Sequence, residues 1–264
     1  MEDDRPAFHR RLRFEIPGEV ELYEKLKAFQ WNASTEIDWN RPVRNFTDES
    51  YDLVKSYFTR EDFDRLRARE RAMTFTQLFV GEQAALALCS QLLNITPEME
   101  TKFCLAGQII DEARHVEVFG RYLDKLGIEE AFVNPPLEEL INRLLDSDHY
   151  GEKIVGMQIF LEGIAVGLFQ RFQEDSPCPL MRDLIRLVLR DESRHSGFGV
   201  IYLADRFQSA SPAERQRVER FVAELWRLFH HATASPFGPI NEFLEATFRD
   251  IAHRLKLIGL ELRA

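Results

Sequence analysis

Apolar residues recur at the three- and four-residue spacing of an amphipathic α-helix along most of the chain from Thr47 onward. Residues 1–46 lack this period and are expected to be irregular. No two alternating segments flank a hairpin turn, so β-structure is not expected. The pattern therefore predicts an all-α fold. The predicted helices span residues 48–58, 60–93, 97–127, 137–144, 148–174, 178–208, 212–234 and 238–260.

Turn-forming residues mark several of the predicted helix ends. Thr96 and Pro97 are typical of a helix start, with proline at the first helical position. Ser211 is followed three residues later by Glu214, which is the pattern of a capping box. Gly127 is expected to end the helix that begins near Pro97.

The predicted helix over 97–127 carries a carboxylate in its apolar stripe. Glu112 lies seven residues from Leu105 and from Phe119, so all three share one line of the helix surface. The line is otherwise apolar and is expected to face the core. A buried carboxylate is costly unless it is paired, hydrogen-bonded or bound to a metal. Glu112 is therefore the first candidate for a functional side chain.

The composition is typical of a globular protein with a large apolar interior. Of the 264 residues, 45% are apolar and 30% are charged, and either one large domain or two small ones would fit this length. The 21 phenylalanines are unusual and indicate that a large apolar space is packed or lined. The formal net charge of −10 argues against binding to nucleic acid or to an anionic membrane surface.

The sequence predicts a cytoplasmic protein without a membrane span. The N-terminal residues have no apolar segment of the kind found in secretory signals. The most apolar run, Ile154–Phe169, is short for a membrane span and contains Gln158 and Glu162. The cysteines are odd in number and are expected to be buried, reduced thiols. They are Cys89, Cys104 and Cys178.

A thirteen-residue motif occurs twice, with an offset of 80 residues. It reads DEARHVEVFGRYL over residues 111–123 and DESRHSGFGVIYL over residues 191–203. In each copy a glutamate precedes a histidine by three residues, so both side chains lie on one face of a helix. A single Glu-x-x-His pair carries little information. The duplication, with aspartate and arginine at matching positions, indicates two related half-sites.

Two further glutamates complete the repeat. Glu82 and Glu162 each precede the glutamate of a motif by thirty residues, within otherwise apolar helical segments. Two helical hairpins that each supply Glu from one helix and Glu-x-x-His from the other form the site of dinuclear carboxylate bundles. The predicted metal ligands, which would also form the catalytic centre, are Glu82, Glu112, His115, Glu162, Glu192 and His195.

This set of donors predicts a cofactor of two iron ions, with a manganese–iron pair as the alternative. Carboxylate oxygens and imidazole nitrogens suit these metals better than they suit a thiolate zinc or copper(I) site. Four carboxylates that face each other in an apolar bundle need two divalent cations to balance their charge. The competing interpretation, ordinary buried ion pairs, requires both matched repeats to arise by coincidence.

The aspartate at the start of each motif is expected to support a histidine. A metal-bound histidine usually donates its second ring N–H to a carboxylate. We expect Asp191 to hold His115 and Asp111 to hold His195, across the bundle. The competing role for both aspartates is ordinary surface charge on a helix.

The motifs also contain arginines and tyrosines with predicted supporting roles. Arg114 and Arg194 are expected to compensate the charge of the two aspartates. Tyr122 and Tyr202 each follow a motif histidine by seven residues, on the same helical line. For these tyrosines, packing with a hydrogen-bonded hydroxyl group is favoured over a redox role.

Apolar residues near the predicted ligands are candidates for the lining of a substrate pocket. Packing in the core is their competing role. The candidates are Phe79, Phe119, Met157, Phe160, Val166 and Val188.

The ligand set and the two aspartates resemble those of the ferritin-like superfamily, in the branch that holds the ribonucleotide reductase small subunit and the bacterial multicomponent monooxygenases. The resemblance covers residues 75–205, and WNASTEIDW is similar to a segment of the small-subunit-like ligand-binding oxidases. It implies a ferritin-like four-helix bundle with extra N- and C-terminal helices. We expect one domain over 1–264, with an N-terminal arm (1–46), a dinuclear core (60–208) and C-terminal helices (209–264).

Departures from these relatives narrow the expected function. The radical tyrosine of the reductase subunit lies four residues after the first histidine, where this chain has Phe119. The ligand-binding oxidases crosslink a tyrosine and a valine at the positions of Met157 and Ala85. The p-aminobenzoate N-oxygenases carry an extra histidine at the position of Val188. Such a site is expected to oxidise a bound substrate rather than one of its own side chains.

The resemblance implies an O2-dependent oxidase or oxygenase with a small, apolar organic substrate. Electrons would come from the substrate or from an external donor, because the chain has no flavin or iron–sulfur motif. A homodimer is the expected assembly. The alternatives are a reductase radical subunit that lacks the usual tyrosine, a ferroxidase or other iron-handling protein, and a non-catalytic ligand-binding relative.

Overall fold

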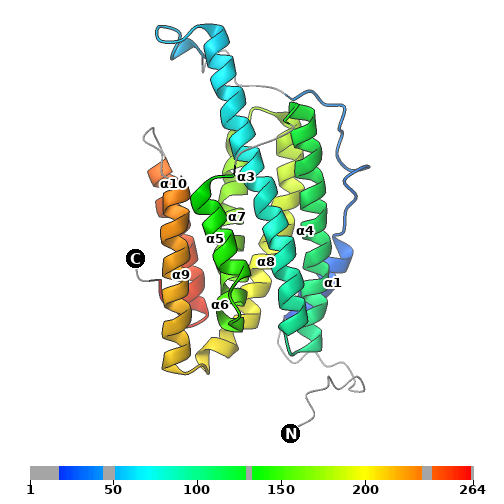
Figure 1. Ribbon diagram of the computed structural model, residues 1–264. Helices are drawn as coiled ribbons and strands as arrows, with labels where there is room; N and C mark the ends of the chain where they lie inside the picture. The colour runs from blue at the N-terminus through cyan, green and yellow to red at the C-terminus, as the bar shows by residue number, and fades with distance from the viewer. Residues whose placement is uncertain (1–17, 44–50, 129–132, 234–239, 263–264) are drawn as a thin grey trace.

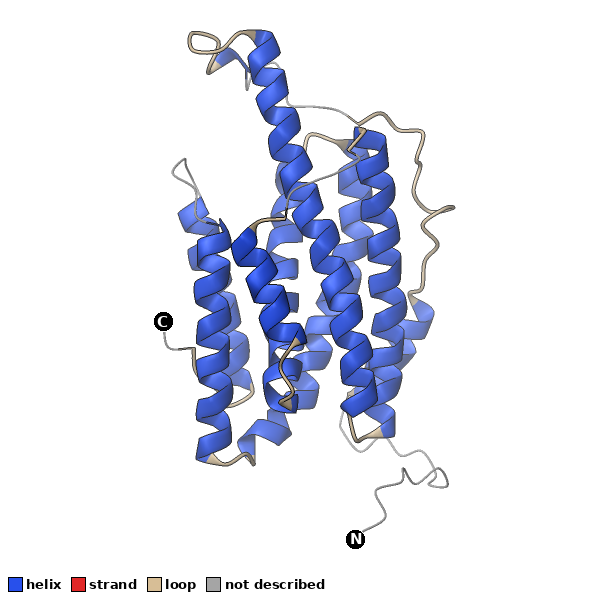
Figure 2. Cartoon of the chain, in the orientation of Figure 1, coloured by secondary structure: helices blue, strands red, loops and turns tan. Residues whose placement is uncertain are grey.

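The computed structural model describes residues 18–43, 51–128, 133–233 and 240–262. All regular secondary structure in these ranges is helical (Figure 2). The helical segments are α1 (Glu19–Ala28), α3 (Arg60–Ile95), α4 (Met99–Leu126), α5 (Pro135–Leu145), α6 (Tyr150–Val155), the π-helical η1 (Gly156–Leu161), α7 (Glu162–Asp175), α8 (Pro179–Gln208), α9 (Pro212–Thr233) and α10 (Ile240–Leu257). The all-α prediction is confirmed.

The centre of the molecule is a four-helix bundle made of two helical hairpins (Figure 1). Helix α3 packs along α4, and α7 packs along α8, while α6, η1 and α7 follow one another without a break. On one side, α1 packs on α4 and α8. On another, α5, α9 and α10 cover the hairpin that contains α6 and α7. The two hairpins match the two halves of the 80-residue sequence repeat.

The core consists of two apolar clusters, one toward each end of the bundle. On α3, Leu78 belongs to one cluster and Ala85 to the other. On α4, Phe119 belongs to the same cluster as Leu78, and Leu105 belongs to the same cluster as Ala85. The predicted metal ligands Glu82 and Glu112 fall between these pairs in sequence. The helices therefore place the glutamates in the interior, with apolar packing on both sides along the bundle.

The structure confirms two of the predicted helix ends and corrects the third. Gly127 closes α4 with a φ of 68°, in the left-handed region that favours glycine. The Ser211 hydroxyl oxygen accepts a hydrogen bond of 3.1 Å from the backbone N–H of Glu214 at the start of α9. The prediction for Pro97 was wrong, because α4 begins only at Met99. Thr96 instead closes α3, where its N–H donates to the carbonyl oxygen of Leu92.

Three other predictions of secondary structure need correction. Residues 1–46 were expected to be irregular, but α1 lies within them and docks Leu26 against α4. The predicted helix at 48–58 begins outside the described residues, and only residues 51–52 of the described part are helical, followed by turns. The predicted helix at 148–174 is interrupted by the π-helical turn η1. Each difference depends on tertiary packing rather than on local periodicity.

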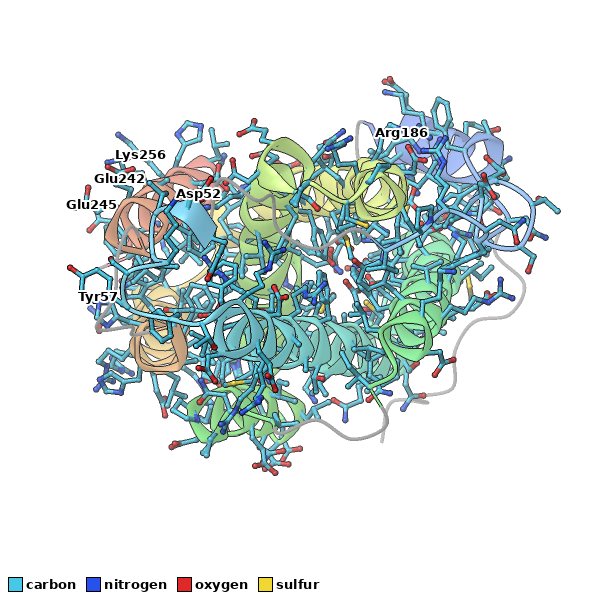
Figure 3. All side chains as sticks on the ribbon, turned by 90° about the horizontal axis from the view of Figure 1, so that it is seen from above. Asp52, Tyr57, Arg186, Glu242, Glu245 and Lys256 are labelled. Carbon is cyan, nitrogen blue, oxygen red and sulfur yellow. The ribbon has the colours of Figure 1, made fainter. Side chains whose placement is uncertain are left out.

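Charged side chains lie around the outside of the bundle when it is viewed along its axis (Figure 3). Asp52, Arg186 and Glu242 are examples, and all three are exposed. Of the described helices, α3 alone is long and apolar enough to cross a membrane by length and composition. One such helix is weak evidence for a span, because core helices of bundles pass the same test.

Gly199 on α8 gives a test of this packing. A Cβ atom at this position would lie 2.7 Å from the backbone oxygen of Gln158, so Gly199→Ala would force α8 and η1 apart. We expect the substitution to lower the free energy of unfolding by about 1–3 kcal/mol. Gly197→Ala is the matched control, since a Cβ there meets no atom within 4 Å.

The control substitution should raise stability by about 1 kcal/mol, because alanine favours a helix over glycine. Urea unfolding followed by circular dichroism measures both variants. Equal effects of the two substitutions would show that the contact between α8 and η1 is not tight.

Candidate metal centre

The bundle brings the six predicted ligands together at its centre. We call them the central cluster, and they are at most 6% exposed. They come from all four bundle helices. Helix α3 supplies Glu82, α7 begins with Glu162, and α4 and α8 each supply a glutamate and a histidine. The members of the central cluster are Glu82, Glu112, His115, Glu162, Glu192 and His195.

The two histidines point the same ring nitrogen at the carboxylates. His115 Nδ1 lies 3.3 Å from Glu82 Oε2 and 3.0 Å from Glu192 Oε1. His195 Nδ1 lies 3.6 Å from Glu162 Oε2 and 3.3 Å from Glu192 Oε2. The ring centroids are 6.1 Å apart. The central cluster thus has two halves, each with a histidine Nδ1 and its own glutamate.

The remaining two glutamates reach both halves. Glu112 places Oε2 3.2 Å from His115 Nδ1 and Oε1 3.3 Å from His195 Nδ1. Glu192 places Oε1 3.0 Å from His115 Nδ1 and Oε2 3.3 Å from His195 Nδ1. Glu112 and Glu192 therefore have the arrangement of bridging carboxylates. Glu82 and Glu162 each face one histidine and have the arrangement of terminal ligands.

The position of Glu162 depends on the π-helical turn before it. Segment η1 widens the helix over Gly156–Leu161, directly before Glu162. Such turns occur often at functional sites, because the extra residue changes the face on which the next side chain lies. A Cβ atom on Gly156 would lie 2.3 Å from Leu144 Cδ2, so this glycine allows η1 to pack closely against α5.

Each histidine contacts the aspartate of the other repeat through its second ring nitrogen. His115 Nε2 lies 3.4 Å from Asp191 Oδ2, and His195 Nε2 lies 3.1 Å from Asp111 Oδ2. The sequence predicts these same two pairs. A carboxylate at Nε2 fixes the orientation of the ring and leaves Nδ1 for the cluster. Both aspartates are fully buried, so they are not surface charge.

The two arginines of the motifs surround these aspartates. Arg194 lies 2.8 Å from Asp111 and 2.9 Å from Asp191, and Arg114 also contacts both. Burial alone would raise the pKa of Asp111, but the hydrogen bond and charge of His195, with Arg194, leave that pKa below its usual value. The same balance, with His115 as the main partner, lowers the pKa of Asp191. Both aspartates are therefore ionised at neutral pH.

Residues before α3 complete this outer network, and the sequence did not single them out for this role. The Trp31 indole N–H donates a hydrogen bond of 2.6 Å to Asp191. Gln30 donates to Asp111 at 3.0 Å and accepts from Arg114 at 2.8 Å. The guanidinium group of Arg114 also lies over the Trp31 ring, 4.6 Å from its centroid. The sequence signal for this segment was its similarity to a segment of the ligand-binding oxidases, which assigned no role to Trp31 or Gln30.

A pair of buried glutamines, of which Gln108 contacts the central cluster and Gln158 contacts Gln108, was missed as site residues. Gln108 Nε2 donates to Glu162 Oε1 at 2.6 Å and to Glu112 Oε1 at 3.2 Å. Gln158 Nε2 donates to Gln108 Oε1 at 2.7 Å. Gln108 and Gln158 lie four residues before Glu112 and Glu162 respectively. That spacing, one helical turn from a ligand, is the signal that could have identified them.

The motif tyrosines make their hydrogen bonds away from the central cluster. The Tyr122 hydroxyl group contacts Cys178 Sγ at 3.6 Å. The Tyr202 hydroxyl group donates to Glu98 at 2.8 Å and lies 2.7 Å from the Tyr150 hydroxyl oxygen. Burial raises the pKa of both phenols, so both stay protonated at neutral pH. These contacts fit the packing role that the sequence favoured.

A cavity of about 190 Å³ lies beside the central cluster, between the bundle and helices α5 and α9. All four glutamates of the cluster reach its wall. Most of the remaining wall is apolar and includes Leu137, Leu140, Met157, Leu168 and Phe229. The sequence could not reveal this cavity, because α5 and α9 lie outside the repeat that identified the site.

Only one of the pocket candidates from the sequence lines this cavity, and that residue is Met157. Phe119 stacks on Phe169 in the core at a centroid distance of 5.8 Å. Phe160 packs edge-on against Phe229. Their apolar character therefore reflects packing in the bundle. The candidates that do not line the cavity are Phe79, Phe119, Phe160, Val166 and Val188.

The central cluster fits a pair of metal ions. Two sets of four donors have ligand atoms within 4.8 Å of one another. One set has His115 and Glu82, the other has His195 and Glu162, and both include Glu112 and Glu192. Glu162 Oε2 and Glu192 Oε1 are buried and accept no hydrogen bond among the described residues. Buried carboxylate oxygens without donors are what a bound cation would satisfy.

In the metal-free protein, protons balance the charge of the central cluster. Burial raises the pKa of Glu82 to about 8 and, together with the charge of Glu192, raises the pKa of Glu162 far above its usual range. Burial disfavours the charged form of both histidines, but the neighbouring carboxylates outweigh it and raise their pKa values. These four groups hold protons at neutral pH. Two divalent cations supply the same positive charge.

The chain matches a known family over most of its length. The family model described as p-aminobenzoate N-oxygenase AurF matches residues 20–249. The matched range includes the whole central cluster, both aspartates and the segment that contains Trp31. No match was found among curated proteins.

Several solved structures share the fold. A tyrosine-to-phenylalanine variant of an R2-like ligand-binding oxidase with a manganese–iron cofactor has a TM-score of 0.72 and 20% identity, covering 98% of this chain and 99% of the other. An aldehyde deformylating oxidase from Synechococcus has a TM-score of 0.61 and 21% identity over 74% and 92% of the two chains. An R2-like ligand-binding oxidase from Sulfolobus acidocaldarius has a TM-score of 0.65 and 17% identity over 98% and 95%.

Metal binding is expected to release protons and to strengthen as the pH rises. The groups that must lose protons at pH 7 are Glu82, Glu162, His115 and His195, because their pKa values are raised. Loading with Mn(II), which avoids reaction with O2, should release about four protons per chain. Affinity should rise between pH 6 and 9, since the proton on Glu82 is lost near pH 8.

Calorimetric titration with Mn(II) in buffers of different ionisation enthalpy measures the number of protons released. Release of fewer than one proton per chain would contradict the proton-balanced state. Glu214→Gln, a change on α9 outside the cluster, serves as the control and should leave the proton count unchanged.

Proposed function

Since the chain belongs to the p-aminobenzoate N-oxygenase AurF family, it is an O2-activating oxidoreductase with a dinuclear iron or manganese–iron cofactor, and we propose that the central cluster holds both metal ions. In this proposal Glu112 and Glu192 would contribute to both metal positions. Glu82 with His115, and Glu162 with His195, complete the two positions.

One observation carries this assignment. Both bridging candidates place one carboxylate oxygen toward each histidine Nδ1, within 3.0–3.3 Å. Ordinary ion pairs do not require two carboxylates to span the same two imidazoles from opposite helices. Two cations shared between Glu112 and Glu192 do require it.

When bound, the metal pair supplies the redox chemistry for the reduction of O2. The chain's own residues provide the setting. Asp111 and Asp191 fix the two imidazole rings through Nε2 and keep Nδ1 directed at the cluster. The apolar wall of the cavity excludes water and positions a small organic substrate beside the four glutamates.

The surroundings of the central cluster favour oxidation of a bound substrate over oxidation of the protein. Phe119 has no hydroxyl group, and Met157 and Ala85 cannot form the tyrosine–valine crosslink of the ligand-binding oxidases. Met157 and Ala85 both line the cavity. The p-aminobenzoate N-oxygenases carry an extra histidine at the position of Val188, which is fully buried in this chain. The reaction therefore draws electrons from the substrate or from an external donor.

The domain organisation, the compartment, the partners and the assembly of the chain are also proposals. The chain forms one ferritin-like domain, acts in the cytoplasm without nucleic-acid or membrane partners, and assembles as a homodimer. Three buried cysteines without disulfides fit a reducing compartment. Leu53 and Tyr57 are more than 80% exposed near the start of α3, and such apolar side chains suit contact with a second copy.

Iron loading and reaction with O2 test the proposed function. The anaerobic protein should bind about two Fe(II) ions per chain, and Mössbauer spectra should show both ions oxidised after O2 is added. Glu112→Ala should abolish tight binding of both ions, because this residue contributes to both positions. Glu82→Ala should retain one ion, because this residue contributes to one position only.

Both variants need a folding control by circular dichroism. Unchanged iron content in Glu112→Ala would overturn the assignment of the ligands. Two bound ferrous ions that stay reduced in air would overturn the oxidoreductase function and leave the metal site standing.

A further inference from the structure

The residues that line the cavity beside the central cluster indicate which charge a substrate can have there. Among the described residues that line it, none is a lysine, arginine or histidine. Residues 129–132 and 234–239, which adjoin lining residues in the sequence, contain no lysine, arginine or histidine either. An anionic group that entered the cavity would therefore lose its hydration without gaining a cationic side chain.

The metal ions would not supply the missing positive charge. Four ionised glutamates would balance two divalent cations, and Arg114 and Arg194 balance Asp111 and Asp191. Arg190 also lies 3.6 Å from Asp191, but its side chain is 38% exposed and its charge is screened by water. The site with its divalent ions is thus close to neutral before a substrate binds. A carboxylate group would add an uncompensated negative charge beside four others.

The end of the cavity away from the glutamates offers neutral hydrogen-bonding groups. Gln77 lies five residues before Glu82 on α3, which places it about 7.5 Å further along the helix. Its side-chain oxygen accepts from the backbone N–H of Asn134, and the Asn134 amide donates to the carbonyl oxygen of Ala232. Thr233 lines the same region. Gln77 Nε2 donates to the carbonyl oxygen of Met73 and the Thr233 hydroxyl group donates to that of Phe229, so these groups are neutral and bonded within the protein.

We propose that this chain oxidises an uncharged, mainly apolar organic molecule and discriminates against carboxylates such as p-aminobenzoate. The proposal rests on the proposed function, because it assumes that the cavity is the substrate site. It differs from the substrate that the name of the family states. The discrimination comes from the lining of the cavity, since a buried carboxylate without a cation is strongly disfavoured.

Binding to the Mn(II)-loaded protein tests the proposal without any turnover. Two matched pairs serve as probes: p-aminobenzoate with its methyl ester, and hexanoate with hexanamide. Calorimetry or thermal shift should show that the neutral member of at least one pair binds at least tenfold more tightly than its carboxylate. Thr233→Lys places a cation in the lining and should raise carboxylate affinity at least tenfold.

Equal or tighter binding of the carboxylates by the wild-type protein would overturn the proposal, and so would the absence of binding by all four probes. The readout is independent of O2 chemistry. A protein that fails to oxidise its iron can still show the preference for neutral ligands, so the two failures are distinguishable.

A second inference comes from the unequal surroundings of the two halves of the central cluster. Each glutamate has a residue four positions before it, and the 80-residue repeat relates these residues in pairs. Gln108 corresponds to Val188, and Gln158 corresponds to Leu78. The half with Glu162 and His195 therefore has two amides, where the other half has two apolar side chains.

The amides act on one oxygen of Glu162. Gln108 donates to Glu162 Oε1 at 2.6 Å, and Gln158 orients the amide of Gln108 by donating to its oxygen. Glu162 Oε2 is buried, accepts no hydrogen bond and faces His195 Nδ1 at 3.6 Å. Among the described residues, no side-chain amide donates to Glu82. The residues that correspond to the two glutamines in the repeat, Leu78 and Val188, have no hydrogen-bond donor in their side chains.

We infer that Gln108 is a positioning residue that restricts Glu162 to a single metal-binding oxygen, Oε2. Glu82 has no such restriction and is able to change between one and two metal-binding oxygens. The two metal positions are consequently unequal, although the sequence repeat supplies them with the same ligands. This inequality depends on a hydrogen bond and not on the ligands themselves.

The test compares the wild-type protein with Gln108→Met, which keeps the approximate shape and removes the donor. In crystals with Mn(II), Glu162 should bind through one oxygen in the wild-type protein and through two in the variant. Mössbauer spectra of the anaerobic Fe(II) protein should show two distinct sites that become more alike in the variant. Gln158→Met, which leaves the donor but frees its orientation, should have a smaller effect.

The same number of Glu162 oxygens on the metal in both proteins would overturn the inference, as would unchanged Mössbauer parameters. Should Gln108→Met fail to fold, the Gln158→Met crystal structure decides. There, binding of Mn(II) by Glu162 through Oε2 alone after the Gln108 amide has turned away would overturn the inference. Binding through both oxygens with the hydrogen bond from Gln108 unchanged would overturn it as well.

Discussion

The burial of four glutamates at one point in an apolar bundle is the constraint on which the rest of this structure depends. Ionised carboxylates in such a position are unstable unless positive charge and hydrogen-bond donors compensate them. Three successive sets of side chains supply this compensation. Histidine Nδ1 atoms face the carboxylates, aspartates hold the histidines, and Arg114 and Arg194 hold the aspartates. Protons or divalent cations then balance the remaining charge.

The same contacts join the two hairpins of the fold. Asp111 lies on α4 and reaches His195 on α8, while Asp191 on α8 reaches His115 on α4. A contact that orients a ligand thus also ties one hairpin to the other. Trp31 extends this connection to the chain before α3 through its hydrogen bond to Asp191. The same contacts therefore stabilise both the bundle and the arrangement of the site.

Sequence alone could identify what the repeat encodes, since matched Glu-x-x-His motifs with their preceding glutamates impose a shared face on each helix. This covers the bundle, the central cluster and the crossed contacts of Asp111 and Asp191. It did not identify α1, because half of that helix consists of charged residues and its docking depends on Leu26 meeting α4. The π-helical turn before Glu162 and the cavity under α5 and α9 likewise arise from packing between distant segments.

The repeat also shows how the two halves of a duplicated site can come to differ. The ligands stayed matched, while the residues one turn away differ: Gln108 in one half stands opposite Val188 in the other. Leu78 lines the cavity, but neither Gln108 nor Gln158 does. The Gln108 amide therefore contacts the cluster from the side away from the cavity. On the cavity side the four glutamates meet a mainly apolar wall, so the two sides of the cluster differ in the hydrogen bonds that they offer.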